Sequence, residues 1–429
     1  MRVLIIGSGA REHALGQIIL RSPGCSGLYF APGNPGTSLL GTNCDISPSD
    51  FEAIAEFVHK EQIQLLVVGP EEPLVKGISD FLANNPLTQS LWVVGPGKAG
   101  AMLEGSKDFA KAFMEKYGIP TARYNAFSAS TIEEAKAFLT TMNPPYVLKA
   151  DGLAAGKGVL ICTSIEEAKQ ELEEMLIHRK FGAASEKVVI EEFLTGTELS
   201  MFVLTDGNNY LLLPEAKDYK RIGENDTGPN TGGMGAVSPV PFADEQFISK
   251  VKQRIIRPTL QGLQQEGIPY RGFIFLGLIS VEGEPLVIEY NVRLGDPEAE
   301  AVLPRIESDF LAHLVAAANG TIGDEQLVIS QAASATIVMA SGGYPGKFNV
   351  GYPISGLHHI NESYVYFAGV SGSSELPISN GGRVLAVTSL APTIEEALVK
   401  SYESASRIHF CDVYFRTDIG KDLIHFLKK

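Results

Sequence analysis

The segment Pro285-Leu-Val-Ile-Glu-Tyr-Asn-Val-Arg293 is an apolar run with polar residues at every second position near its end. The run predicts a buried β-strand. Because alternate side chains of a strand point to the same side, Glu289, Asn291 and Arg293 are expected to share one face. A carboxylate and an amide carbonyl are hard oxygen ligands for Mg²⁺, and a guanidinium can bind phosphate or carboxylate bidentately. The segment therefore indicates a magnesium–nucleotide site, with a strand-end salt bridge as the alternative.

The bulk composition limits the classes of function. The chain has 429 residues, 45% hydrophobic and 20% charged, which is typical of a globular protein with several domains. A net charge of −15 argues against general binding to nucleic acids or anionic membranes. No apolar run is long enough to span a bilayer, and the chain starts directly with the predicted strand Arg2–Ile6. The four cysteines are far apart in sequence, as expected for thiols of a reducing compartment. We therefore expect a cytoplasmic protein.

Alternating strands and helices mark the N-terminal part. Short apolar runs, each ended by Gly or Pro, predict strands at Val3–Ile6, Leu28–Phe30, Leu65–Val68 and Trp92–Val94. Helical patterns lie between them at His13–Leu20 and Phe51–Lys60. This order predicts a parallel α/β sheet covered on both faces.

The pattern changes after about residue 121. Strands are predicted after this point at Tyr146–Lys149, Gly158–Cys162, Val188–Glu191, Leu199–Leu204, Phe273–Val281 and Pro285–Asn291, and helices at Ile165–Ile177, Glu245–Glu266 and Thr393–Ile408. A further helix is predicted before it, at Ser106–Tyr117. The segment Asp218–Ser238 lacks periodicity and predicts a long functional loop. We expect an α/β and α+β multidomain protein: an N-terminal α/β domain over 1–105, a two-lobed core over 106–325 with a small lobe at about 121–195, and a small mixed β/α C-terminal domain over 326–429.

Two N-terminal motifs indicate anion or sugar binding. Gly7-Ser-Gly9-Ala-Arg11-Glu12 follows the first strand, so its amides and Arg11 can approach a phosphate at a helix start. A dinucleotide fingerprint would need Gly or Ala in place of Glu12, so an NAD site is disfavoured. Glu71 follows another strand and could hold sugar hydroxyls. Tight β–α turns are the alternative for both motifs.

Three further motifs suit nucleotide chemistry. The segment Lys149–Gly158 places a glycine-rich flap after a strand, where its amides can cover a triphosphate, although the spacing is not that of a Walker A loop. In the following motif, Val188–Glu198, Glu198 could accept hydrogen bonds from ribose hydroxyls. Asp218 and Lys220 precede a loop rich in Gly, Asn and Thr, which suits an anionic substrate and a developing acyl phosphate. A glycine hairpin, surface carboxylates and a solvent loop are the respective alternatives.

The order of these motifs resembles that of the ATP-grasp superfamily. More narrowly, several strings resemble the phosphoribosylamine–glycine ligase family: Gly7-Ser-Gly-Ala-Arg-Glu-His13, Ala31-Pro-Gly-Asn-Pro-Gly-Thr37, Lys149-Ala-Asp-Gly-Leu-Ala-Ala-Gly-Lys-Gly-Val159, Asp226-Thr-Gly-Pro-Asn-Thr-Gly-Gly-Met-Gly-Ala236 and Gly295-Asp-Pro-Glu298. The resemblance extends along the whole chain. It implies an N-terminal domain preceding an ATP-grasp core, and ATP-dependent ligation of glycine to 5-phosphoribosylamine through glycyl phosphate in de novo purine biosynthesis.

The resemblance also implies roles for individual residues. Contacts with ATP are implied for Lys107, Lys149, Gly156, Glu191, Phe193, Leu194 and Glu198. Metal ligation is implied for Glu289 and Asn291, and catalytic roles at glycine and the transferring phosphoryl group for Arg293, Asp218 and Lys220. Contacts with the ribosylamine phosphate are implied for Gly9, Arg11 and Glu12, and Glu71 and Asp296 are also expected to bind this substrate. The implied cofactors are ATP and Mg²⁺ or Mn²⁺.

One departure from the superfamily pattern concerns the metal. Many ATP-grasp enzymes carry a second metal carboxylate about a dozen residues before the Glu of Glu-x-Asn, but here Phe273-Ile-Phe-Leu-Gly-Leu-Ile279 contains no acid. Only Glu289 and Asn291 are therefore expected as protein ligands. The alternatives are another ATP-grasp carboxylate–amine ligase, a nucleotide-binding regulatory protein, or an NAD-dependent oxidoreductase. We expect small-molecule substrates, no nucleic-acid or membrane partner, and a monomer.

Overall fold

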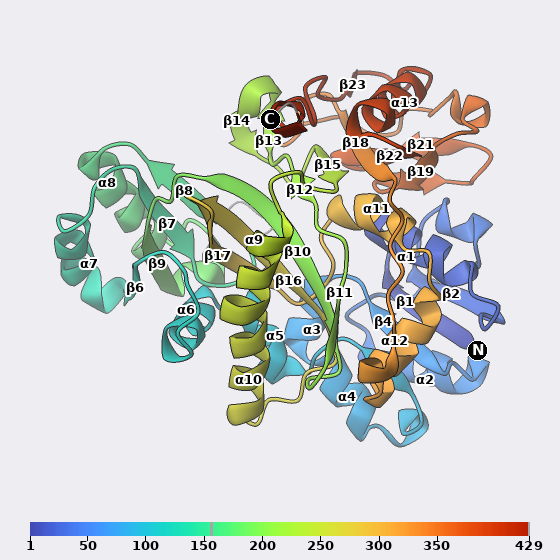
Figure 1. Cartoon of the computed structure of the whole chain (residues 1–429), viewed down its shortest axis with the longest axis horizontal. Helices are drawn as coiled ribbons and strands as arrows, with labels where there is room; N and C mark the ends of the chain where they lie inside the picture. Colours follow the sequence, from blue (N-terminus) through green and yellow to red (C-terminus); the bar gives the residue numbers. More distant parts are fainter. Residues whose placement is uncertain (155–157, 428–429) are drawn as a thin grey trace.

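The computed structural model describes residues 1–154 and 158–427 (Figure 1). The flap residue Gly156 lies outside the described residues. No helix of the described chain is both long and apolar enough to cross a membrane.

The N-terminal sheet is parallel, with strand order β3-β2-β1-β4-β5, as its sequence pattern predicts. Its strands are β1 Arg2–Gly7, β2 Gly27–Pro32, β3 Thr42–Asn43, β4 Leu65–Val68 and β5 Trp92–Val94, and its helices are α1 Ala10–Leu20, α2 Phe51–Glu61, α3 Glu71–Lys76, α4 Ile78–Asn84 and α5 Lys98–Gly105. A Cβ on Gly16 would lie 2.4 Å from the Phe30 ring, so this glycine lets α1 pack closely on β2.

The next lobe packs around a core of its own. It is an antiparallel sheet of order β6-β9-β7-β8 covered by α7 and α8, and the preceding helix α6 leads into it. The bounds are α6 Lys107–Lys116, β6 Tyr124–Ser128, α7 Ile132–Leu139, β7 Tyr146–Ala150, β8 Val159–Cys162, α8 Ile165–Leu176 and β9 Lys187–Glu192. Because its buried cluster is separate from the others, this lobe is a distinct packing unit, set apart from the body of the molecule (Figure 1).

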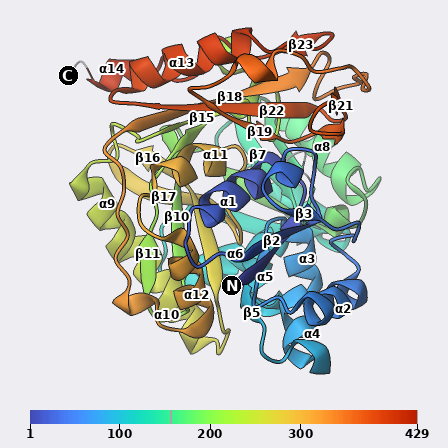
Figure 2. The same cartoon turned by 90° about the vertical axis from the view of Figure 1, so that its right-hand side faces the viewer.

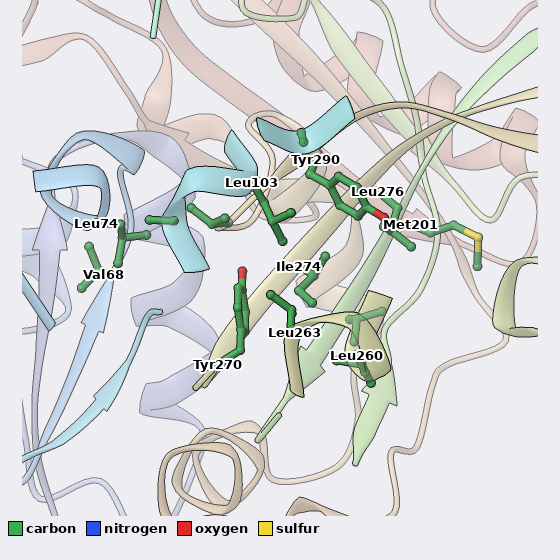
Figure 3. Packing of buried hydrophobic residues seen from close by; sticks show 14 of the residues in the cluster. Val68, Leu74, Leu103, Met201, Leu260, Leu263, Tyr270, Ile274, Leu276 and Tyr290 are labelled. Atoms are coloured by element: carbon green, nitrogen blue, oxygen red, sulfur yellow. The ribbon is translucent and has the colours of Figure 1, made fainter. Parts of the chain in front are cut away.

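The larger lobe shares its core with the N-terminal domain. Its antiparallel sheet has the order β11-β10-β16-β17, formed by β10 Thr197–Thr205, β11 Tyr210–Leu212, β16 Gly272–Val281 and β17 Glu284–Asn291. Figure 3 shows Met201, Leu276 and Tyr290 of this sheet in the same cluster as Val68 and Leu74 of the N-terminal domain. The strand ends that carry the predicted site are thus fixed against the N-terminal domain.

The helix predicted over Glu245–Glu266 is divided. It consists of α9 Glu245–Val251, a π-helical turn Lys252–Ile256, and α10 Arg257–Gln265. Pro258 has no N–H, and its ring crowds the carbonyl four residues earlier. The widened turn before it relieves that conflict.

The segment Asp218–Ser238 was predicted to be an irregular loop, and this prediction is wrong in part. It contains β13 Arg221–Gly223 paired with β14 Thr227–Asn230, and β15 Gly235–Ser238 paired with β12 Lys217–Asp218 and with the distant β18. Since β18 begins almost a hundred residues later, at Ala333, local periodicity could not reveal this partner.

The C-terminal part builds a sheet across the other domains. The sheet order is β12-β15-β18-β22-β19, with β23 also paired to β18, and Figure 2 shows it with α13 above the N-terminal domain and the core. The bounds are α11 Glu298–Val302, α12 Phe310–Asn319, β18 Ala333–Ser341, β19 Tyr364–Phe367, β20 Val370–Gly372, β21 Pro377–Ser379, β22 Arg383–Ala391, α13 Ile394–Ser406, β23 Val413–Tyr414 and α14 Ile424–Leu427.

Candidate active site

Glu289 and Asn291 end β17, beside a position on β16 that has no side chain. Gly277 pairs with Glu289, and a Cβ on Gly277 would lie 3.0 Å from Glu289 Cγ. Among the described residues, no hydrogen bond or ion pair reaches either polar side chain, and no cluster of three or more His, Cys, Asp or Glu residues could hold a metal. A carboxylate and an amide alone fit a magnesium ion that keeps water and phosphate oxygens as its other ligands.

The charges of three lysines act on the Glu289 carboxylate. Burial alone would raise the pKa of Glu289, but the ammonium groups of Lys220, Lys149 and Lys107 hold that pKa below its usual value. The Lys107 ammonium donates to the Gly152 carbonyl at 2.9 Å, at the start of the predicted flap. Three cations around one carboxylate make a site that is suited to a polyanion.

Lys149 is held by a buried carboxylate. Its Nζ lies 2.8 Å from Glu191 Oε1 and donates to the Ile288 carbonyl at 3.2 Å. The other oxygen of Glu191 pairs with Lys111 Nζ at 2.9 Å, and the three side chains are between 2% and 7% exposed. Glu191, expected near ATP, therefore engages two lysines through its carboxylate, while Phe193, in the turn after β9, is exposed.

Arg293 bridges the N-terminal domain and the core. Its Nε donates to Glu71 Oε2 at 3.2 Å, and its Nη2 donates to Glu104 Oε1 at 2.9 Å. Glu104 also accepts the Val292 amide at 2.8 Å. Burial raises the pKa of Glu104 to about 7, against the opposing charge of Arg293. Glu71, predicted to hold sugar hydroxyls, thus has a protein partner in this structure.

Asp218, Lys220 and Glu198 form one charged cluster with Glu298. Lys220 Nζ lies 3.0 Å from Glu198 Oε2 and 3.9 Å from Asp218 Oδ2. Glu298 accepts a hydrogen bond from Ser200 Oγ at 3.0 Å. Burial and the nearby Asp218 charge raise the pKa of Glu298 to about 7. Burial likewise raises the pKa of Asp218. A further cation bound beside Asp218 and Glu298 would therefore favour the charged forms of both carboxyl groups.

A pocket of about 300 Å³ opens at the carboxyl ends of β1 and β4. It is lined by the predicted residues Gly9, Arg11, Glu12 and Asp296, among others. Glu12 accepts the Gly9 amide at 2.6 Å and pairs with Arg11 Nε at 2.7 Å. The end of a parallel sheet is where ligands of open α/β folds bind.

Glycines make room for the Glu12 carboxylate in this pocket. A Cβ on Gly7 or Gly69 would lie 2.6 Å or 2.0 Å, respectively, from Glu12 side-chain atoms. Of the residues predicted to bind the sugar phosphate, Gly9, Arg11, Glu12 and Asp296 thus line one pocket, whereas Glu71 does not line it.

Sequence reasoning missed Glu104, Lys111 and Glu298. Glu298 ends the motif Gly295-Asp-Pro-Glu298, so its motif was visible although its partners were not, and Glu104 lies three residues before the predicted ATP contact Lys107. Lys111 carries no motif; its only local signal is a lysine on the buried face of α6.

Comparisons with known proteins match nearly the whole chain to one family. Three family models of phosphoribosylglycinamide synthetase match: the N domain over residues 1–104, the ATP-grasp (A) domain over 105–299 and the C domain over 334–422. A phosphoribosylamine–glycine ligase of Chlorobaculum tepidum is 45% identical over 427 residues, covering 98% of this chain and 99% of that protein.

Solved structures give the same result. A phosphoribosylamine–glycine ligase of Thermotoga maritima, 37% identical, superposes with a TM-score of 0.84 over 97% of this chain and 100% of that one. The biotin carboxylase domain of a Hydrogenobacter thermophilus 2-oxoglutarate carboxylase, only 16% identical, shares the fold with a TM-score of 0.71 over 99% of this chain and 98% of that one. The chain therefore belongs to the phosphoribosylamine–glycine ligase family.

Proposed function

We propose that this protein joins glycine to 5-phosphoribosylamine at the expense of ATP, forming glycinamide ribonucleotide, ADP and phosphate in de novo purine biosynthesis. The observation that carries the proposal is the arrangement at the end of β17. There the charges of Lys107, Lys149 and Lys220 act on the Glu289 carboxylate, and Arg293 follows four residues later.

Lys107 and Lys149 bind the phosphates of ATP in this proposal. Phosphoryl transfer requires charge neutralisation and alignment more than covalent help, and both ammonium groups are fixed by hydrogen bonds to backbone carbonyls. Glu289 and Asn291 hold a divalent cation, Mg²⁺ or Mn²⁺, which when bound offsets the negative charge of the phosphates. Glu198, at the start of β10, accepts hydrogen bonds from the ribose hydroxyls of ATP.

Glycine binds between Arg293 and the carboxyl cluster. Asp218 and Glu298 are buried acids with raised pKa values, so an ammonium group beside them restores their charged forms. Arg293 keeps donors beyond those used by Glu71 and Glu104, and a guanidinium matches the geometry of a carboxylate. The carboxylate of glycine is thereby directed toward the phosphates.

The sugar phosphate binds in the pocket at the start of α1. Its phosphate accepts hydrogen bonds from the backbone amides at this helix start and from Arg11. Glu12 and Asp296 accept hydrogen bonds from the sugar hydroxyls. The glycine carboxylate first takes the γ-phosphoryl group of ATP, so that ADP leaves and glycyl phosphate forms. The sugar amine then attacks the carbonyl carbon of glycyl phosphate; the C–N bond forms, the C–O bond to phosphate breaks, phosphate leaves, and the nitrogen loses a proton. Because an acyl phosphate is lost to water, the site must be closed during this step, and the separate core of the small lobe lets that lobe move as a unit.

The proposal is tested by the substrate dependence of ADP release. We expect ADP to form only when glycine and freshly generated 5-phosphoribosylamine are both present, with glycinamide ribonucleotide formed in equal amount. ADP release that needs a different amino acid or a different amine would instead indicate another carboxylate–amine ligase. Replacing Mg²⁺ by Mn²⁺ in the same assay determines the metal preference, and sedimentation of the active protein tests the predicted monomer.

A further inference from the structure

The C-terminal domain contacts the sugar-phosphate pocket through one arginine. Arg383, the first residue of β22, donates from Nη1 to the Asp296 carbonyl at 2.8 Å and to the Gly232 carbonyl at 2.7 Å. The same nitrogen lies 2.9 Å from Asp296 Oδ1. A single guanidinium therefore joins the C-terminal domain, the segment after β14, and an acid that lines the pocket.

The neighbouring backbone is shaped around this guanidinium. A Cβ on Gly232 would lie 2.8 Å from Arg383 Cζ, so the guanidinium packs directly against the Gly232 backbone. Gly233, with φ +116°, lies against Pro297, where a Cβ would be 2.4 Å from Cδ. The Gly232 amide donates to Tyr344 Oη at 3.2 Å, a second contact from the C-terminal domain.

The two oxygens of Asp296 have different surroundings. Oδ1 is taken by Arg383, whereas Oδ2 lies on the side of Gly9, 3.6 Å from where a Cβ of that glycine would stand. Gly9 and Asp296 both line the 300 Å³ pocket. With Oδ1 occupied, the orientation of the carboxylate is fixed and Oδ2 is the acceptor offered to a ligand.

We propose that Arg383 is a positioning residue for the sugar-phosphate substrate: it holds Asp296 so that Oδ2 accepts hydrogen bonds from the sugar hydroxyls. The proposal rests on the proposed function, because that function supplies the ribose. It extends the site to the domain over 326–429, which contributes none of the described residues that line the pocket. Recognition of the sugar hydroxyls then depends on a contact made from outside the pocket.

The test uses the stable product as a probe. Calorimetry measures the affinity for glycinamide ribonucleotide and for its 2,3-dideoxyribose analogue, which lacks both hydroxyls. The wild-type protein should prefer the ribose form by about tenfold or more, as expected for hydrogen bonds to a charged acceptor. In Arg383→Met this preference should fall below about threefold, while the affinity for MgADP stays within about twofold.

Three variants sharpen the result. Gly232→Ala keeps the arginine but displaces its guanidinium, and no positive φ at Gly232 adds backbone strain, so it should lose the preference as well. Arg383→Lys should recover part of it, since one ammonium can still reach Asp296. Arg21→Met is the matched control: this arginine also contacts the C-terminal part, donating to Tyr364 Oη at 2.8 Å, but it caps the opposite end of α1, so the preference should persist.

Each outcome has one meaning. If the wild-type protein does not bind glycinamide ribonucleotide, the proposed function is wrong. If it binds and Arg383→Met keeps the full preference for ribose, Arg383 does not position Asp296 and the inference is overturned. If Arg383→Met loses affinity equally for glycinamide ribonucleotide, its dideoxyribose analogue and MgADP, the inference is also overturned, because that pattern indicates a general structural role. Dissociation constants do not depend on the folded fraction, so partial misfolding does not hide the answer.

Discussion

Replacing Glu191 by Gln removes the only carboxylate between two buried lysines, Lys111 and Lys149, within the described chain. Their side chains are 2% and 7% exposed, and the carboxylate lies 2.9 Å and 2.8 Å from the two ammonium groups. Breaking a buried ion pair from one side costs about 3–5 kcal/mol, because a charge is left buried without its partner. An amide can still accept one hydrogen bond, but it cannot offset either charge. We therefore expect the small lobe to lose about 3–5 kcal/mol of stability at pH 7.

This loss should shrink as the pH rises. Burial lowers the pKa of Lys111 to about 8, although Glu191 acts to raise it. The unfolded chain, with a lysine pKa of about 10.4, binds more protons above pH 8, so deprotonation of Lys111 favours the folded state as the pH increases. Without Glu191 the pKa of Lys111 falls further, so the pH range in which its deprotonation stabilises the folded state begins at lower pH. The deficit of Glu191→Gln should therefore be smaller at pH 9 than at pH 7.

Urea titration followed by far-UV circular dichroism measures the effect. With a slope of about 2 kcal/mol per M, the first unfolding midpoint should fall by about 1.5–2.5 M at pH 7. Glu173→Gln is the control, because it breaks a partly exposed pair with Lys136 in the same lobe and should lower the midpoint far less than Glu191→Gln does. Equal midpoints for Glu191→Gln and Glu173→Gln, or a deficit that grows with pH, would refute the reasoning.

Three further predictions concern the site and the core. The double variant Glu289→Ala, Asn291→Ala should lower kcat/KM in ADP release by about 10³-fold, since the metal contributes several kcal/mol to phosphoryl transfer; native turnover would place the metal elsewhere. The KM for glycine should rise as the pH falls through about 7, where Glu298 gains a proton, and Glu298→Gln should weaken this dependence, leaving the part that comes from Glu104 beside Arg293; a flat wild-type profile would contradict the assignment. Gly16→Ala should lower the free energy of unfolding by about 1–3 kcal/mol, because its Cβ meets the Phe30 ring at 2.4 Å; an unchanged melting temperature would mean that α1 can move away from the sheet.

Local sequence signals were sufficient for most of the fold. The predicted strands Leu65–Val68 and Trp92–Val94 coincide with β4 and β5, because short apolar runs between turn residues form buried parallel strands without further information. Helix α6 begins where Ser106 caps it, as its sequence indicates. The pairing of β15 with β18 escaped prediction because it joins segments a hundred residues apart.

The candidate site was predictable in its residue types but not in its pairings. The alternation at Glu289 and Asn291 follows from strand geometry. In contrast, the contact of Arg293 with Glu104 spans 189 residues, so it depends on how two domains pack. The role of Lys111 follows only from its ion pair with Glu191, which joins α6 to β9 in the folded chain. The energy of an ion pair depends on burial and distance, and sequence order determines neither.

The fate of the glycine oxygens tests the central claim most directly. If the site converts glycine to glycyl phosphate before the amine attacks, glycine labelled with ¹⁸O in its carboxylate must pass one labelled oxygen to inorganic phosphate in each turnover. Mass spectrometry of the phosphate should therefore find one ¹⁸O atom per glycinamide ribonucleotide formed. Product formation with unlabelled phosphate would contradict activation of glycine by the γ-phosphoryl group at this site.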